Sequence, residues 1–424
     1  MELVTNGLHF PTSVALGADS VYIAESGLAF GGAKAGGRVL RLNADGSTQC
    51  LKDALRPPVN GLTYHHGMLI IAEGGNPGRI SRLVNEESWT VVLDNLPGLG
   101  NYHTNMVAVG PDGRYYFSQG AMTNLGVMGL DAYELGWLRQ LPHDHDVPGC
   151  DLVLAGINVE TANPLANEQP ARATTGAFMP FGAATLPGDT VAAGLPCTAA
   201  VLSCASDGSE LRLEAWGIRN AYGLGFLPDG RLLAVDQGSD DRGSRPIGNV
   251  PDLLFEVRSD RWYGWPDFIG DTPVTDPSFR PTRGPAPEFV LSNHDELPPL
   301  ATPLLKFPVN TSATKFDVIP SGRWKGHLVV AMFGDEKPMT APSGPKVGRG
   351  IARIDPTDWS FHPIDAGPFV RPIDVRFDPS DHSLLVLDFG EFEMSTDLRV
   401  EARSGSGKLW RLTAAEFSAA CGLP

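Results

Sequence analysis

A polar pair and a polar cluster flank one predicted hairpin near the middle of the chain. Arg219-Asn220 stands before an apolar run, a Pro-Asp-Gly turn follows at 228–230, and a second apolar run leads into the polar cluster 236–241. Turn residues between two apolar runs predict an antiparallel pair of strands. The two ends of such a hairpin share one edge, so the guanidinium, amide and carboxylate groups should gather there. A guanidinium stabilises developing negative charge and oxygen ligands bind a hard cation, which makes this edge the candidate functional face.

His103 is a further candidate, because it directly precedes another hairpin of the same kind. The strand that begins at Thr104 leads to a Pro-Asp-Gly turn at 111–113, as the strand after Arg219-Asn220 leads to the turn at 228–230. A neutral imidazole can accept the proton of a hydroxyl group. If the two hairpins lie side by side, His103 lies beside the face that carries Arg219.

The hairpin recurs at six places, and this repetition predicts the fold. Its first strands are expected at 11–16, 59–63, 104–109, 222–227, 315–319 and 372–377, each followed by a second strand. Third strands of similar sequence follow, such as GRVLRL at 37–42 and GKLWRL at 407–412. Self-similarity at this period is typical of propellers, whose four-stranded blades surround an axial channel. The sequence therefore predicts an all-β fold, a six-bladed β-propeller.

Two long segments interrupt the repeats. Residues 121–199 and 267–311 are rich in proline, alanine or threonine and show too little periodic apolar pattern for a core of their own. We expect both to be loop insertions on one face of a single domain that spans 1–424, where they wall in a substrate pocket. Helical periodicity is best at 131–141 and 413–421.

The composition argues against several classes of partner. The chain of 424 residues has 42% hydrophobic and 19% charged residues, which allows a large core. Its net charge of −16 opposes binding to nucleic acid. We expect no membrane span, because no apolar run approaches the roughly 20 residues that one needs. The first residues lack the pattern of a secretion signal, so the protein is either cytosolic or begins after a removed signal.

The five cysteines do not form a metal or haem motif. None of them lies in a C-x-x-C spacing, and they are too scattered for a disulfide scaffold. Cys150 and Cys197 share one irregular segment and could pair in an oxidising compartment, and Cys204 lies close by in sequence. The pairing among these three stays open beside the alternative of five free thiols.

Three segments carry a resemblance to a known family. HTNMVAVGPDGRYYFSQG at 103–120, WGIRNAYGLGFLPDGRLLAVDQGSDD at 216–241 and WYGWP at 262–266 resemble the glucose/sorbosone dehydrogenase family. Members of this family are six-bladed propellers that hold pyrroloquinoline quinone (PQQ) with calcium. The resemblance implies an oxidoreductase that oxidises an aldose, a sorbosone-like aldehyde or a related polyol and passes electrons to an external acceptor. It also implies a periplasmic or secreted protein.

The resemblance assigns roles to individual residues. His103 is similar to the family's general base and Arg219 to its cationic partner. Contacts to the cofactor are implied for Asn220, Gln237, Arg371 and, more distantly, Lys346. The implied calcium site comprises Gly238 and Ser239, through their carbonyls, and Asp241. The chain differs from the family pattern at four positions, which are Ala121, Tyr222, Ser239 and Ile373.

Two other function classes fit the same repeats. A propeller lactonase, lyase or epimerase would hold an axial calcium through side chains. Glu25, Glu73 and Asp388 end second strands and Asn60 and Asn105 begin first strands, so their oxygens could converge on the axis. A non-catalytic binding propeller is the third class, and it predicts no convergent group of titratable residues.

Overall fold

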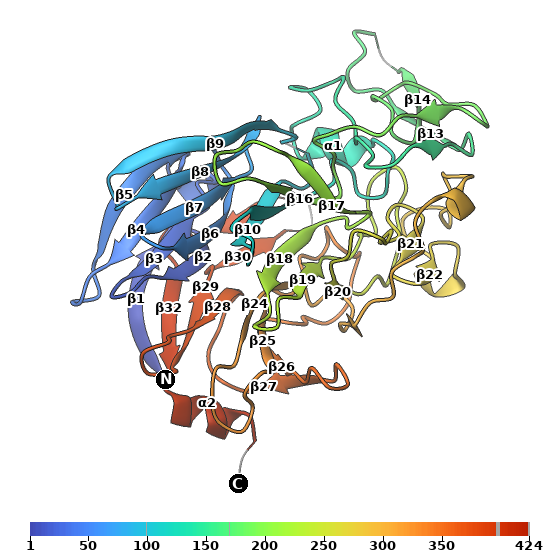
Figure 1. Cartoon of the computed structure of the whole chain (residues 1–424). Coiled ribbons are helices and arrows are strands. Elements are labelled where there is room, and N and C mark those ends of the chain that lie inside the picture. The colour runs from blue at the N-terminus through green and yellow to red at the C-terminus, as the bar shows by residue number, and fades with distance from the viewer. Residues whose placement is uncertain (99, 169, 396–398, 423–424) are drawn as a thin grey trace.

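The computed structural model describes residues 1–98, 100–168, 170–395 and 399–422. Six four-stranded antiparallel sheets are arranged as blades around a central axis (Figure 1). The predicted six-bladed β-propeller is thus confirmed. Within the described residues no helix is long and apolar enough to span a membrane.

Each blade runs from an innermost to an outermost strand. In blades 1 to 3 the strands are, in this order, β2 (Pro11–Leu16), β3 (Val21–Glu25), β4 (Gly37–Leu42) and β5 (Thr48–Leu55); β6 (Val59–His65), β7 (Met68–Glu73), β8 (Gly78–Val84) and β9 (Ser88–Leu96); β10 (Thr104–Val109), β11 (Tyr115–Gln119), β16 (Ala200–Cys204) and β17 (Arg212–Trp216). In blades 4 to 6 they are β18 (Ala221–Phe226), β19 (Leu232–Asp236), β20 (Leu253–Glu256) and β23 (Leu305–Lys306); β24 (Ala313–Val318), β25 (Leu328–Met332), β26 (Gly350–Ile354) and β27 (Phe361–Ile364); β28 (Pro372–Phe377), β29 (Leu384–Asp388), β32 (Gly407–Leu412) and β1 (Glu2–Leu8).

The remaining elements lie between the blade strands. Small two-stranded pairs are formed by β12 (Leu152–Val153) with β15 (Thr190–Val191), β13 (Asn158–Ala162) with β14 (Arg172–Gly176), β21 (Phe268–Ile269) with β22 (Thr272–Pro273), and β30 (Phe392–Met394) with β31 (Val400–Ala402). The helical segments are α1 (Leu130–Glu134), α2 (Ala414–Ala420), η1 (Phe30–Gly32), η2 (Pro277–Phe279) and η3 (His294–Glu296). The helix expected at 131–141 is shorter than predicted, because Gly136 takes a left-handed backbone angle (φ 87°) just after α1.

The ring closes through strands from the two ends of the sequence. Each innermost strand packs beside that of the next blade, and β28 packs beside β2. In blade 6 the outermost strand is β1, which pairs antiparallel with β32. The closure leaves no blade with a free inner edge.

Apolar side chains of the second strands form the core between blades. One fully buried residue from the second strand of each blade illustrates the pattern: Ile23, Ile70, Phe117, Val235, Val330 and Val386. Neighbouring blades present such residues to each other, so the blades are held by apolar packing.

A bulge interrupts the innermost strand of every blade at the same place. In blade 1, Pro11 pairs with Glu25 and Ser13 pairs with Ala24, so Thr12 is an extra residue without a cross-strand partner. The same two-against-one register occurs in the other five blades, at Asn60, Asn105-Met106, Tyr222, Thr314-Lys315 and Ile373. Bulges redirect side chains and leave backbone groups outside the ladder.

The two insertions contact each other beside blades 3 and 4 (Figure 1). A β-bridge joins Leu154 in the first insertion to Leu291 in the second. The buried Arg245 guanidinium donates to the Leu125 carbonyl (2.9 Å), the Pro266 carbonyl (2.8 Å) and the Asp267 carboxylate (2.7 Å). The second insertion also ends earlier than expected, because Leu305–Lys306 forms the outermost strand of blade 4.

Candidate functional site

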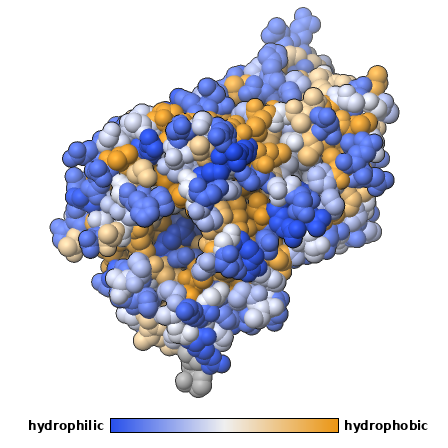
Figure 2. Space-filling view, in the orientation of Figure 1, coloured by the Kyte–Doolittle hydropathy of each residue, from blue (hydrophilic) through white to orange (hydrophobic). Residues whose placement is uncertain are grey.

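A cavity of about 230 Å³ opens at the propeller axis. Each blade contributes its bulge residue to the lining, namely Thr12, Asn60, Asn105, Tyr222, Thr314 and Ile373. The face seen in Figure 2 is hollowed near the axis, where hydrophilic residues lie between apolar ones. The repeated bulge is therefore the device that turns one side chain per blade toward a common space.

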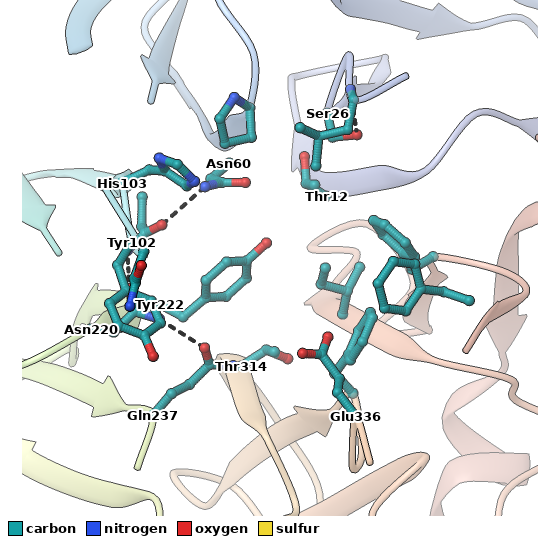
Figure 3. Close-up of a pocket in the computed structure, with 18 of the residues that line it drawn as sticks. Thr12, Ser26, Asn60, Tyr102, His103, Asn220, Tyr222, Gln237, Thr314 and Glu336 are labelled. Atoms are coloured by element: carbon teal, nitrogen blue, oxygen red, sulfur yellow. Dashed lines mark hydrogen bonds between the residues drawn. The ribbon is translucent and has the colours of Figure 1, made fainter. Parts of the chain in front are cut away.

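One side of the cavity is a continuous chain of amide side chains (Figure 3). The Asn60 Nδ2 donates to Asn105 Oδ1 (3.0 Å), the Asn105 Nδ2 donates to Asn220 Oδ1 (2.8 Å), and the Asn220 Nδ2 donates to Gln237 Oε1 (2.8 Å). These bonds fix the orientation of four amides from blades 2, 3 and 4. Fixed neutral donors and acceptors suit the hydroxyl groups of a polyol.

The opposite side is apolar and mainly aromatic. Its members include Phe30, Phe333, Phe389 and Phe392, which contact one another edge to face or at a tilt with centroids 5.3 to 6.0 Å apart. The pairing of an amide wall with an aromatic wall suits a ligand that has both hydroxyl and C–H surfaces.

His103 lies at the edge of the cavity just before β10 (Figure 3). Its Nδ1 is buried and has no hydrogen-bond partner in the described structure. Desolvation lowers the pKa of His103 to about 4, so the imidazole is neutral over most of the pH range. A backbone hydrogen bond with Gly74 offsets this lowering of the His103 pKa only in part. The side chain can therefore accept a proton, as a weak base.

Glu336 lines the same cavity from the other side, and the sequence analysis missed it (Figure 3). It follows β25 in the loop before β26, and its carboxylate has no hydrogen-bond partner among the described residues. Desolvation, countered in part by Arg371, raises its pKa to about 7. The sequence signal for Glu336 was weak, because Asp335-Glu336 does not follow the end of its second strand directly, as Gln237-Gly238 does.

The Arg219 guanidinium is engaged by the loops around it. It donates to the carbonyls of Asn124 (3.1 Å), Gln237 (2.8 Å) and Gly238, and to the Asp240 carboxylate (3.0 Å). Its carbon Cζ also lies 4.1 Å from the centroid of the Tyr102 ring. Arg219 is buried and outside the central cavity, where it holds the 236–241 loop against blade 3.

The other predicted site residues lie at different distances from the cavity. Asn220 and Gln237 line it, whereas Gly238 and Ser239 line a second polar cavity of about 160 Å³ that shares Asn101, Tyr102, Gln237 and Glu336 with the first. The Gly238 carbonyl accepts from Arg219, and the buried Ser239 hydroxyl donates to the Asn124 carbonyl (3.4 Å).

Asp241, Arg371 and Lys346 form structural contacts and do not line the central cavity. The Asp241 carboxylate accepts from the backbone amides of Thr282 (2.7 Å) and Arg283 (3.2 Å). Arg371 is fully buried, and its guanidinium donates to the Phe392 carbonyl (2.7 Å), the Asp335 carbonyl (2.9 Å) and the Glu393 carboxylate (3.1 Å). Lys346 is exposed and pairs with Glu393 (3.2 Å).

The carboxylates that were candidates for an axial metal are also engaged locally. Glu25 accepts from the His9 amide (2.7 Å), Glu73 from the Arg56 amide (2.7 Å), and Asp388 from the Arg371 amide (2.9 Å). In the described parts of the chain, no three His, Cys, Asp or Glu side chains converge as a metal site. All five cysteines are free thiols.

These residues do not fit a bound PQQ. The cofactor carries three carboxylates, which need cationic or amide partners. Among the described residues that line the central cavity, none is a lysine or an arginine, and the unpaired Glu336 would repel an anion. The second cavity contains Arg219 and Arg242, but both pair with Asp240 (3.0 Å each), and three more carboxylates line it. Binding PQQ would require Arg219 and Arg371 to leave their present partners.

Comparison with known proteins shows the fold. No protein family and no curated protein matches the sequence. Among solved structures, an oxidoreductase described as a glucose dehydrogenase from Thermus thermophilus is 18% identical, with a TM-score of 0.52 over 97% of this chain and 98% of that chain. The PQQ domain of pyranose dehydrogenase from Coprinopsis cinerea is 13% identical, with a TM-score of 0.56 over 97% of this chain and 94% of that chain. These likenesses match the propeller architecture that the family resemblance implied.

Proposed function

We propose that this chain is an enzyme that binds a neutral, polyhydroxylated small molecule of the sugar or sugar-lactone class in its central cavity and acts on it by proton transfer. One observation carries the proposal. His103, with an unpartnered buried nitrogen, and Glu336, with a free carboxylate, face one cavity whose other polar groups are uncharged. Two titratable groups whose pKa values are pushed apart are the usual signature of an acid and a base.

The protonation states assign the roles. Between the His103 pKa of about 4 and the Glu336 pKa of about 7, the imidazole is neutral and the carboxyl group is protonated. His103 is then the base and Glu336 the acid. On a sugar lactone, the imidazole takes a proton from water, the water oxygen attacks the carbonyl carbon, and the ring C–O bond breaks. Glu336 gives its proton to the leaving oxygen, so one lactone and one water yield one hydroxy acid.

The pH dependence of lactone hydrolysis tests this assignment. We expect a bell-shaped profile of kcat/KM with limbs near pH 4 and pH 7, the pKa values of His103 and Glu336. Activity falls in acid because His103 becomes protonated, and it falls in alkali because Glu336 loses its proton. The measurement is initial-rate hydrolysis of D-glucono-1,5-lactone, corrected for the spontaneous reaction. A profile that is flat between pH 5 and pH 9 would contradict the assignment.

The second candidate is PQQ- and calcium-dependent oxidation of an aldose, a sorbosone-like aldehyde or a related polyol, with an external electron acceptor. The fold shared with the PQQ domain of pyranose dehydrogenase favours it, as does the place of His103 at the cavity. A periplasmic or secreted location would accompany this function. The engagement of Arg219 and Arg371 with backbone carbonyls weighs against it.

A titration separates the two candidates. We expect that PQQ and calcium added to the protein leave the quinone absorbance spectrum unchanged, because the central cavity offers no guanidinium or ammonium to the cofactor's carboxylates. Glucose with a dye acceptor should then not be oxidised. Saturable spectral change together with dye reduction would favour the dehydrogenase instead.

A further inference from the structure

A buried lysine contacts three residues that line the central cavity. Lys315 belongs to the bulge of β24 in blade 5, and only 1% of its surface is exposed. Its Nζ reaches across the axis and donates to the Thr12 carbonyl of blade 1 (2.6 Å) and to the Asn60 carbonyl of blade 2. One ammonium thus connects three blades.

The bulges explain why those carbonyls need a cation. Thr12 and Asn60 are the extra residues of their bulges and have no cross-strand partner in the blade ladder. Two carbonyl oxygens that point to one spot repel each other and are costly to bury without a donor. Such a pair of oxygens is the ligand type that a hard metal ion prefers, and here the Lys315 ammonium occupies the position.

A third bulge residue contacts the same charge. The Lys315 Nζ lies 5.2 Å from the centroid of the Tyr222 ring, on its face, which is a cation–π contact. The Tyr222 hydroxyl points into the cavity (Figure 3) and has no hydrogen-bond partner among the described residues.

The charges around Lys315 are few and come from blade 6. Asp374 is fully buried, and its carboxylate accepts from the Val14 amide (2.9 Å), the Ser13 hydroxyl (3.0 Å) and Arg376 (3.1 Å). Asp374 partly offsets the cost of burying the ammonium, although burial still lowers the pKa of Lys315 to about 7.

We propose that the Lys315 ammonium is a built-in axial cation, which positions the cavity floor by holding Thr12, Asn60 and Tyr222 around one charge. Lys315 is a positioning residue, because its ammonium acts on the floor residues that meet the ligand. The inference rests on the proposed function only in taking the cavity as the ligand site.

Rescue by a small cation tests the proposal without depending on the reaction. Lys315→Ala removes the ammonium and leaves a space below the cavity that is bounded by two carbonyls and the Tyr222 ring. Calorimetry should detect binding of methylammonium to this variant, with a rise in Tm, and no such binding to the wild type. Lys306→Ala is the matched control, because Lys306 is an exposed lysine that pairs with Asp271 (2.6 Å). Its variant should not respond to methylammonium.

Activity provides the second readout. A hydrogen bond to a charged group contributes about 1.5–3 kcal/mol, so loss of the ammonium in Lys315→Ala should lower kcat/KM of lactone hydrolysis by about 10- to 150-fold. Methylammonium should restore most of the lost activity, whereas neutral acetamide should not. If Lys315→Ala does not fold, Lys315→Met decides, since a fully active and stable Met variant overturns the proposal. Absence of methylammonium binding to a folded Lys315→Ala overturns it too. A wild type without lactonase activity instead overturns the proposed function and leaves the calorimetric test valid.

Discussion

Glu336→Gln should lower kcat/KM for lactone hydrolysis by about 100-fold or more and remove the alkaline limb of the pH profile. Glutamine keeps the size of the side chain but cannot donate an acidic proton to the leaving oxygen. The Glu336 carboxylate has no hydrogen-bond partner among the described residues, so the substitution breaks no such contact in the fold. The expected change is in kcat more than in KM, because the proton is transferred in the transition state.

Two comparisons make this result specific. Glu87→Gln changes an exposed carboxylate in the outer part of blade 2 and should leave the rate and the profile unchanged. His103→Ala should remove the acid limb instead, because the base that titrates near pH 4 is lost. Retention of the alkaline limb in Glu336→Gln would show that another group is the acid.

Asp267→Ala should lower the free energy of unfolding by about 3–5 kcal/mol, the usual cost of leaving one charge of a buried ion pair alone. The Asp267 carboxylate is fully buried and accepts from Arg245 (2.7 Å), His294 (3.0 Å) and the amides of Val290 (3.0 Å) and Leu291 (2.8 Å). Burial acts to raise the pKa of Asp267, but Arg245 and His294 hold this pKa below its usual value. The stability that ionised Asp267 contributes is therefore present at neutral pH and lost in strong acid, where the carboxylate is protonated.

Urea unfolding followed by tryptophan fluorescence measures the effect. Trp262 stacks on His294 with centroids 5.7 Å apart, so the probe lies beside the altered site. Asp260→Ala is the control, because Asp260 is an exposed carboxylate that pairs with Arg258 (3.2 Å), and its loss should cost less than about 1 kcal/mol. Equal stability of the two variants would mean that Asp267 does not anchor the second insertion.

The propeller was predictable because its signal is local and repeated. Apolar runs separated by Pro-Asp-Gly or similar turns specify hairpins, and six copies specify a ring. The predicted strands GRVLRL and GKLWRL coincide with β4 and β32. The bulges were not predictable, because one extra residue in a strand changes neither the apolar pattern nor the turn.

The candidate site was predictable only in part, for a physical reason. His103, Asn220 and Gln237 line the cavity because strand ends in a propeller gather at the axis. The guanidinium of Arg371 instead donates to the carbonyls of Asp335 and Phe392, which are distant in sequence, and no sequence pattern encodes such contacts. Glu336 was missed because nothing next to it in sequence marks it as unpaired.

The closure of blade 6 has a consequence for the order of folding. β1 pairs with β32, so the first strand of the chain can pair only after a partner about four hundred residues later has been made. During synthesis, blades 1 to 5 can form from neighbouring hairpins. Until blade 6 is made, β1 and the side of blade 5 that will face blade 6 stay exposed. Contacts of such sequence separation form slowly, and unpaired strands invite association between chains. Refolding should therefore be limited by this last pairing, and its yield should fall as protein concentration rises.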